Sequence, residues 1–308
     1  MLFLSFVFIF FVSLPFHYIS FLSVHQFGKG GRSVLLNKER SVREVLNDAN
    51  GNLINLYRVV REHPDELKDR LLYVMHNRED FKIAQRRLEE ATGRCFPVLP
   101  QQDGNSSDSQ GKLAEKKPEV SSPVLRAADF YQVVRQSYAG NGKQFSAVAR
   151  SMWAGFPAID RVAGRLQGVT LEKEDFGVIF QRYDSPNTHF YIDPPYVYTE
   201  DYYPGNIFLC SDHQRLAAIL LNVEGLWLLS YNLCPEVLEL YQQPGILIEQ
   251  VDRINNMAQR YESGAVFQEV LISNYDTIKQ TPEQLFQSLL KSLPTWSWRV
   301  TKATTVKN

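Results

Sequence analysis

The sequence predicts an α/β fold built on a parallel sheet with helices on both faces. From about residue 170 onward, apolar runs suited to strands alternate with amphipathic stretches suited to helices. A second α/β piece, at residues 24–60, contains the strand-like run REVLND followed by a helical pattern. Between the two lies a helical segment that carries a long polar loop. The fold is therefore expected to be split, with a helical insertion separating the two parts of one sheet.

Composition limits the class of protein. The chain has 308 residues, of which 44% are hydrophobic, enough for a sizeable core. Its 33 Lys and Arg residues nearly balance its 34 Asp and Glu residues, so a polyanionic partner would need a local basic patch. The three cysteines, Cys95, Cys210 and Cys234, form no CxxC pair and have no histidine at ligand spacing. We expect reduced thiols, no metal site and a cytoplasmic protein.

The N-terminal run is unusual because residues 1–24 contain no Lys, Arg, Asp or Glu. Such a run is long enough to span a bilayer or to form the apolar core of a signal peptide. Against both, a basic n-region is missing, and Pro15 and His17 interrupt the run. We treat residues 1–25 as an atypical hydrophobic segment outside the catalytic sheet, with membrane contact through residues 1–24 as an alternative. An altered start site or reading frame is a further hypothesis for its origin.

The first half of the chain is expected to be mainly helical. A short strand ends at Asn47 and Asp48, and apolar residues then recur at helical spacing until Pro64 opens a second helix. Residues 101–122 are polar and predict a mobile loop. Further helices are expected over residues 80–93, 125–139 and 157–167.

The second half is expected to alternate strands and helices. The predicted strands are FYIDPP, GLWLLSYN, GILIEQV and VFQEVLISNY, and the predicted helices are residues 211–222 and PEVLELY.

The stretch HFYIDPPYVY, residues 189–198, ends a strand on an acid, two prolines and a tyrosine. Ligands of open α/β sheets gather at the carboxyl ends of strands, where Asp193 is expected to lie. Pro194 and Pro195 stiffen the loop and remove two N–H donors, and Tyr196 adds a flat ring. Two acceptors beside an aromatic face suit a planar group that bears an amino function, such as a nucleobase. The alternative is an ordinary diproline turn in which the acid caps a helix.

A glycine-rich stretch, QFGKGGRSVLL, precedes the strand that ends at Asp48. Glycines after a strand let the backbone approach a bound cofactor, and an acid about 20 residues further on can accept both hydroxyls of a ribose. Taken alone, most glycine-rich runs are simple turns. The acid at the expected distance favours a cofactor site.

These motifs, in this order, resemble the D12 class of adenine-N6 DNA methyltransferases, which includes the DNA adenine methylases. The resemblance extends over most of the chain from about residue 26. It comprises the glycine-rich loop, the block LNDANGNLINLYRVVREHPDEL, a variable helical insertion, and then FYIDPPYV, LLSYN and EVLISNY.

The resemblance implies a Rossmann-like S-adenosylmethionine-dependent methyltransferase sheet with an inserted, mostly helical target-recognition domain. The catalytic domain would comprise residues 26–61 and 169–308, and the insertion would comprise residues 62–168 with the flexible loop 101–122. The partner would be double-stranded DNA. The basic residues of the insertion that would contact its phosphates or bases are Arg126, Arg135, Lys143, Arg150 and Arg161.

The resemblance also implies residue roles. S-adenosylmethionine would be bound by Phe27, Gly28, Gly30, Gly31 and Asp48. A flipped-out adenine would enter a pocket made by Asp193, Pro194, Pro195 and Tyr196. Asp193 and the Pro194 carbonyl would accept hydrogen bonds from N6, Tyr196 would stack on the base, and Pro195 would hold the shape of the loop. No metal would be needed.

The chain departs from the family pattern at the cofactor loop. His25, Gln26 and Phe27 stand where acid-Pro-Phe is expected, Lys29 takes a glycine position, and the preceding glycine-glycine-lysine motif is absent. These departures predict impaired cofactor binding. Two alternatives follow from this region: a catalytically inactive DNA-binding relic of the family, and a membrane-anchored α/β protein.

Overall fold

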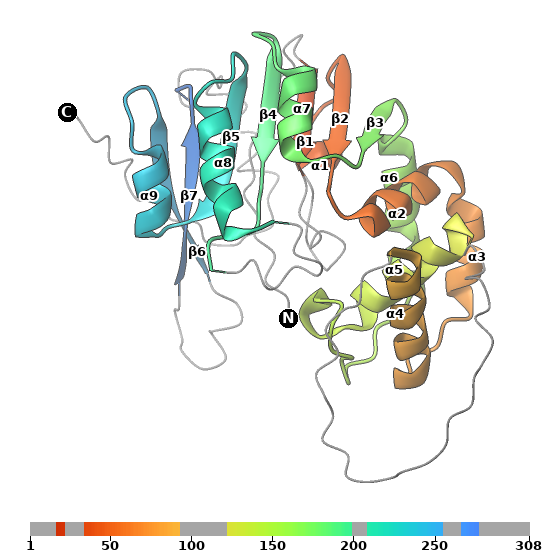
Figure 1. Cartoon of the computed structure of the whole chain (residues 1–308). Helices are drawn as coiled ribbons and strands as arrows, with labels where there is room; N and C mark the ends of the chain where they lie inside the picture. The colour runs from red at the N-terminus through yellow and green to blue at the C-terminus, as the bar shows by residue number, and fades with distance from the viewer. Residues whose placement is uncertain (1–16, 22–33, 93–121, 199–207, 255–265, 277–308) are drawn as a thin grey trace, which may run out of the picture.

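The computed structural model describes residues 17–21, 34–92, 122–198, 208–254 and 266–276. Seven strands form one sheet in the order β3-β2-β1-β4-β5-β7-β6 (Figure 1). Their bounds are β1 His17–Phe21, β2 Arg43–Asn47, β3 Val169–Glu172, β4 Thr188–Ile192, β5 Leu226–Asn232, β6 Leu247–Ile254 and β7 Val266–Ser273.

The predicted parallel sheet is correct for the strands from β3 to β5 and wrong for β7. Strand β7 runs antiparallel to both of its neighbours, β5 and β6. Parallel neighbours need a long crossover, whereas strands that are consecutive in the chain and adjacent in the sheet pair antiparallel. The strands β6 and β7 have this second relationship.

Strand β1 lies inside the N-terminal run that we expected to stand outside the sheet. Its five residues pair in parallel with β2 on one side and with β4 on the other, so the run supplies the central strand of the parallel part. A strand buried on both faces of a parallel sheet has no need of charged residues. The absence of charge that suggested an anchor is therefore also what a central strand requires, and the sheet begins at His17 rather than after residue 25.

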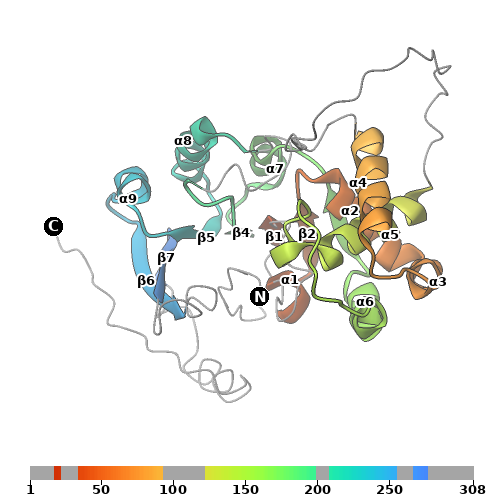
Figure 2. The same ribbon diagram turned by 90° about the horizontal axis from the view of Figure 1, so that it is seen from below.

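Helices lie on both faces of the sheet. Figure 2 shows α7 (Phe176–Tyr183), α8 (Cys210–Leu220) and α9 (Pro235–Tyr241) on one face and the short α1 (Val34–Asn37) on the other. Alternate residues of the strands accordingly enter two different cores. In β4, Phe190 and Ile192 pack in one core with Trp227, while Tyr191 packs in the other with Leu46. Helix α7 and strand β3 were not expected from the sequence.

The remaining helices are α2 (Gly51–Glu62), α3 (Pro64–Leu72), α4 (Arg78–Thr92), α5 (Pro123–Gln136) and α6 (Phe156–Arg165). They pack together beside β2 and β3, with α5 against both α2 and α4 (Figure 1). Pro64 begins α3, as predicted, because the first turn of a helix leaves its N–H groups without intrahelical partners. The polar loop predicted at residues 101–122 falls almost wholly outside the described residues.

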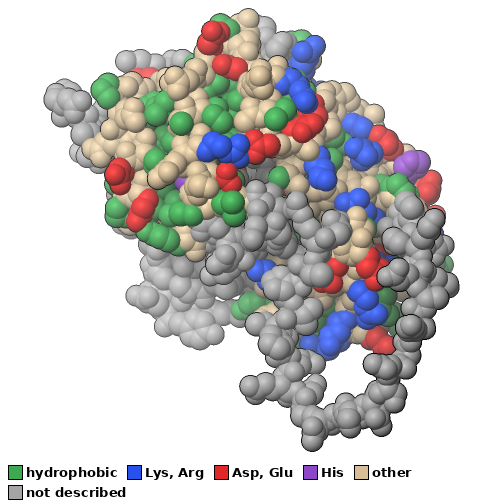
Figure 3. Space-filling view, in the orientation of Figure 1, with side chains coloured by type: hydrophobic (Ala, Val, Ile, Leu, Met, Phe, Trp, Pro, Cys, Tyr) green, Lys and Arg blue, Asp and Glu red, His purple; other side chains and the backbone are tan. Residues whose placement is uncertain are grey.

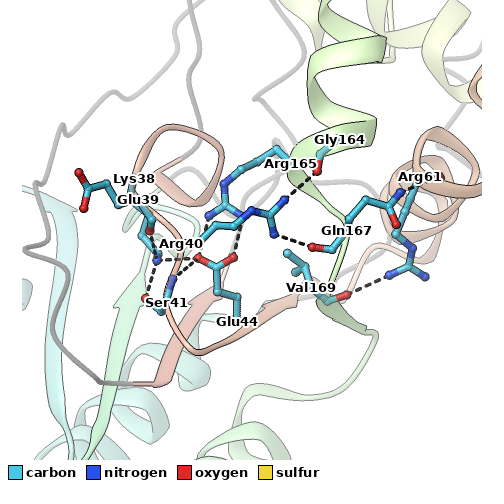
Figure 4. A network of polar contacts seen from close by, with 10 residues as sticks. All are labelled: Lys38, Glu39, Arg40, Ser41, Glu44, Arg61, Gly164, Arg165, Gln167 and Val169. Carbon is cyan, nitrogen blue, oxygen red and sulfur yellow. Dashed lines mark hydrogen bonds and ion pairs between the residues drawn. The ribbon is translucent and has the colours of Figure 1, made fainter.

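The helical part is attached to the sheet by a network of charges and backbone contacts (Figure 4). Arg165 at the end of α6 donates to both carboxylate oxygens of Glu44 in β2, at 2.6 and 2.7 Å. Lys38, whose side chain is only 2% exposed, donates to the same carboxylate at 2.7 Å. Arg61 at the end of α2 donates to the Val169 carbonyl of β3 at 2.9 Å. The end of α6 is thus held against β2, and the end of α2 is held against the start of β3.

Candidate functional site

The register of the central strands brings two acidic residues to one edge of the sheet. Phe21, the last residue of β1, is paired with Asn47 of β2 on one side and with Ile192 of β4 on the other. Asp48 and Asp193 directly follow those two residues. The backbones of Asp48 and Asp193 are therefore two strand spacings apart, or about 10 Å, with β1 between them. The order of the strands reverses between β1 and β4, and open α/β sheets bind ligands at such a switch point.

The carboxylate of Asp193 is buried and oriented. Asp193 lies immediately after β4 and is 8% exposed. Ser230, on the neighbouring strand β5, donates a hydrogen bond to Asp193 Oδ1 at 2.8 Å. Burial, together with the nearby Asp193 charge, raises the pKa of Tyr191 well above its usual value, so this phenol stays neutral. The carboxylate is thus held in one direction at the edge of the sheet.

The residues after Asp193 form a pinned loop. Pro194 and Tyr196 are buried, and Pro195 is half-buried. The ring of Tyr196 lies 6.3 Å from that of Tyr231 in β5, a tilted aromatic contact. Asn232 at the end of β5 accepts from the Val197 N–H at 3.1 Å and donates to the Val197 carbonyl at 3.3 Å. The structure therefore brings together all four residues predicted to bind the base.

Asp48 carries an unusual carboxyl group. Its Oδ1 accepts from the N–H of Asn50 at 2.6 Å, while its buried Oδ2 has no hydrogen-bond partner among the described residues. Burial raises the pKa of Asp48 to about 8, with the hydrogen bond from Asn50 acting in the opposite direction. A buried oxygen without a partner costs free energy unless a ligand supplies a donor. Once ionised, this carboxyl group would offer an acceptor to a ligand hydroxyl at the end of β2.

This acceptor fits the ribose of a bound nucleoside. Two adjacent hydroxyls can both donate to one carboxylate, which is the chemistry expected at the end of the second strand. The other residues predicted to bind the cofactor, Phe27, Gly28, Gly30 and Gly31, lie outside the described residues. In the sequence they fall between β1 and α1.

Two histidines, His189 in β4 and His213 in α8, contact tyrosine hydroxyls. His189 is buried, contacts the Tyr275 hydroxyl at 3.1 Å, and burial lowers its pKa to about 3. His213 Nδ1 lies 2.7 Å from the Tyr231 hydroxyl. Sequence reasoning missed Asn47, whose side chain bonds to the backbone of Glu174. A polar residue at the end of an apolar strand was the only available signal.

The basic residues predicted to meet DNA differ in their surroundings. Arg126 donates to Asn52 at 2.7 Å, and Arg135 donates twice to the Ser151 carbonyl. Arg161 on α6 is exposed, and Lys143 and Arg150 are half-buried. On the face seen in Figure 3, Lys and Arg side chains are more frequent over the helical part than over the sheet, with acidic residues among them. Arg126 and Arg135 thus support the packing of the helices.

The described residues contain no group of three or more His, Cys, Asp or Glu side chains placed to hold a metal ion. None of the helices in the described ranges is both long enough and apolar enough to cross a bilayer.

Comparison with known proteins agrees with this geometry. No curated protein matches the chain in sequence. The family model of the D12 class N6 adenine-specific DNA methyltransferases matches residues 29–257, a span that includes both Asp48 and Asp193. Enzymes of this class transfer a methyl group from S-adenosylmethionine to N6 of adenine in DNA. Since the match covers most of the chain, the protein belongs to the D12 class of N6 adenine-specific DNA methyltransferases.

Proposed function

We propose that the protein is a site-specific adenine methyltransferase whose base pocket is formed by Asp193, Pro194, Pro195 and Tyr196. The observation that carries this proposal is the buried Asp193 carboxylate, oriented by Ser230 at the switch point of the sheet. The Asp193 carboxylate and the Pro194 carbonyl accept the two N–H groups of adenine N6. These bonds keep the nitrogen lone pair directed away from the acceptors and available for attack. Tyr196 stacks on the base and Pro195 keeps the loop rigid.

We propose that Asp48 holds the cofactor ribose and that Phe27, Gly28, Gly30 and Gly31 line the rest of its site. Bound S-adenosylmethionine supplies an electrophilic methyl group. The chain contributes position: the width of β1 separates the ribose acceptor from the base acceptor, so that donor and base meet above the end of that strand. The fit rests on the buried Asp48 oxygen that lacks a partner in the described residues.

We further propose that the helices between residues 62 and 168 select the DNA site. The exposed Arg161 on α6 is the strongest candidate for a phosphate contact, because Arg126 and Arg135 already donate to groups of the protein itself. Phosphate contacts would hold the enzyme on the duplex, and a base in the pocket must first leave the stack.

The direct test is the substitution Asp193→Ala, assayed by transfer of a labelled methyl group to unmethylated DNA made by polymerase chain reaction. We expect methylation to be abolished while S-adenosylmethionine binding and the melting temperature are retained. Asp184→Ala is the matched control, because Asp184 precedes β4 and, among the described residues, accepts hydrogen bonds from the backbone N–H groups of Glu224 and Gly225. This control should lower the melting temperature and leave the rate of methyl transfer unchanged. Methylation by the Asp193 variant would overturn the assigned role.

The inactive relic remains the competing hypothesis, because the sequence departs from the family pattern between His25 and Gly31. Calorimetric titration with S-adenosylmethionine separates the two hypotheses. Saturable binding at micromolar concentrations together with methyl transfer supports the enzyme. DNA binding without cofactor binding supports the relic.

A further inference from the structure

Two asparagines at the functional edge of the sheet make the same unusual contact. Asn47, the last residue of β2, accepts from the Glu174 N–H at 2.9 Å and donates to the Glu174 carbonyl at 3.0 Å. Asn232, the last residue of β5, makes the equivalent pair of bonds to Val197, at 3.1 and 3.3 Å. In each case one planar amide satisfies both backbone groups of a single loop residue. We call these two arrangements the Asn47 clamp and the Asn232 clamp.

Each clamp holds the loop that follows a neighbouring strand. Val197 lies just beyond the pocket loop after β4, and Glu174 lies in the loop between β3 and α7. A side-chain amide that bonds both the N–H and the carbonyl of one residue imitates one step of a β ladder. The clamps therefore extend the hydrogen bonding between neighbouring strands beyond the strand ends, where backbone pairing has stopped.

The two clamped loops belong to different halves of the site. Val197 directly follows Tyr196, so the Asn232 clamp fixes the ring that would stack on the base. Asn47 directly precedes Asp48, and its clamp draws the β3–α7 loop against the start of α2. There, the side chain of Lys173 lies against Gly51, since a Cβ added to Gly51 would lie 2.8 Å from Lys173 Cε.

We infer that Asn47 and Asn232 are positioning residues with separate tasks: the Asn47 clamp shapes the cofactor half of the site, and the Asn232 clamp shapes the base half. This inference rests on the proposed roles of Asp48 and Asp193. The physical reason is that small displacements of preorganised groups reduce turnover strongly, whereas one hydrogen bond contributes little to total stability.

The structure also provides a matched control. Asn274, directly after β7, accepts from the Trp227 N–H at 2.8 Å and donates to the Gly225 carbonyl at 2.9 Å. Because β7 runs antiparallel to β5, this amide lies at the opposite edge of the sheet, next to the start of β5. Asn274→Ala therefore removes two bonds of the same chemistry far from Asp48 and Asp193.

The test compares Asn47→Ala, Asn232→Ala and Asn274→Ala in the full chain. We expect Asn47→Ala to raise the Kd for S-adenosylmethionine roughly tenfold or more and to change KM for DNA little. Asn232→Ala should leave that Kd within about twofold and lower kcat on unmethylated DNA roughly ten- to hundredfold. Asn274→Ala should lower the melting temperature and change neither quantity.

A second measurement does not depend on activity. Amide hydrogen exchange should accelerate at Asp193 and residues 196–198 in Asn232→Ala and at residues 173–176 in Asn47→Ala, and neither substitution should affect the loop of the other. If an alanine variant does not fold, the aspartate variants Asn47→Asp and Asn232→Asp keep the shape and the acceptor while losing the donor, and the exchange pattern is read on those. Uniform acceleration at both loops, or equal effects on cofactor and DNA parameters, would overturn the inference.

The outcome is separable from that of the proposed function. If Asp193→Ala still methylates DNA, the assigned catalytic role fails whatever the clamps do. If Asp193→Ala is inactive while Asn47→Ala and Asn232→Ala behave like Asn274→Ala, the proposed function stands and the clamp inference fails.

Discussion

Ser230 on β5 donates its hydroxyl hydrogen to Asp193 at the end of β4, over 2.8 Å. This bond crosses between two adjacent strands, so the direction of the carboxylate is set by the sheet rather than by the loop. A hydrogen bond to a charged group contributes about 1.5–3 kcal/mol, and a tenfold change in rate corresponds to about 1.4 kcal/mol, so we expect Ser230→Ala to lower kcat roughly ten- to hundredfold. The Kd for S-adenosylmethionine should not change. Ser273→Ala is the control, because the Ser273 hydroxyl donates to the Tyr275 carbonyl and not to Asp193; an equal loss of kcat there would refute the orienting role.

The protonation of Asp48 predicts how stability depends on pH. Its pKa is raised from 3.8 to about 8 by burial, so between these values the folded protein holds a proton that the unfolded chain releases. The contribution of Asp48 to the free energy of unfolding is therefore full below pH 3.8 and declines as pH rises toward 8. Asp48→Asn, which cannot ionise, should gain on the wild type by roughly 4 kcal/mol between pH 5 and pH 9 in urea unfolding without cofactor, because each pH unit from 5 to about 8 lowers the contribution of Asp48 by about 1.4 kcal/mol. A gap that stays constant with pH would contradict this account.

The same group predicts a pH dependence of cofactor binding. A ribose whose two hydroxyls both donate needs the ionised carboxylate, so binding must release the Asp48 proton wherever the pH lies below about 8. We expect affinity for S-adenosylmethionine to rise as pH increases from 6 to 8. Calorimetry in buffers of different ionisation enthalpy should show proton release close to one per site at the lower pH. In Asp48→Asn both the affinity and the proton release should be largely lost.

The junction between β2 and α6 predicts a large effect on stability. Glu44→Ala would leave Lys38 and Arg165 without their shared carboxylate, and Lys38 is 2% exposed. Breaking a buried ion pair by removing one partner typically costs about 3–5 kcal/mol. The control is Glu66→Ala, which removes an exposed pair with His63 and should cost less than about 1 kcal/mol. Chemical denaturation of both variants measures the difference, and equal losses would show that burial of the junction is unimportant.

The glycine-rich loop offers a gain-of-function prediction. Lys29 occupies a glycine position of the family pattern and lies outside the described residues. If its side chain restricts the backbone at the cofactor, Lys29→Gly should lower the Kd for S-adenosylmethionine about three- to tenfold. Lys29→Ala removes the charge but keeps a Cβ, so it separates charge from backbone freedom. A Kd for Lys29→Gly that equals the wild-type value would show that the departure at this position is harmless.

Much of the fold was predictable because local patterns agreed with it. The ends of β2 and β4 fell where acids interrupt apolar runs, and Pro64 marked the start of α3. Strand β1 was misread because an apolar run without charges suits a membrane and a central strand equally well. The direction of β7 is set by which strands become neighbours, a tertiary property that no local pattern contains.

The candidate site was predictable to the same extent. The Asp193 loop and Asp48 each had a recognisable motif. Their proximity followed only once both strands were seen to pair with Phe21. The contacts of Asn47 and Asn232 were not predictable, because a side-chain amide that bonds a distant loop leaves no periodic trace in the sequence.

The attachment of the helical part has a consequence for how such enzymes diverge. Gln167 donates to the Arg61 carbonyl and Arg61 donates to the Val169 carbonyl, so the end of α2 and the start of β3 are tied to each other (Figure 4). Everything between them begins and ends at one fixed place. We expect helices of another length or sequence to be tolerated between these two points while Asp48 and Asp193 keep their spacing. If these helices select the DNA site, as we propose, such an exchange would change the site that is recognised and leave the residues proposed for methyl transfer in place.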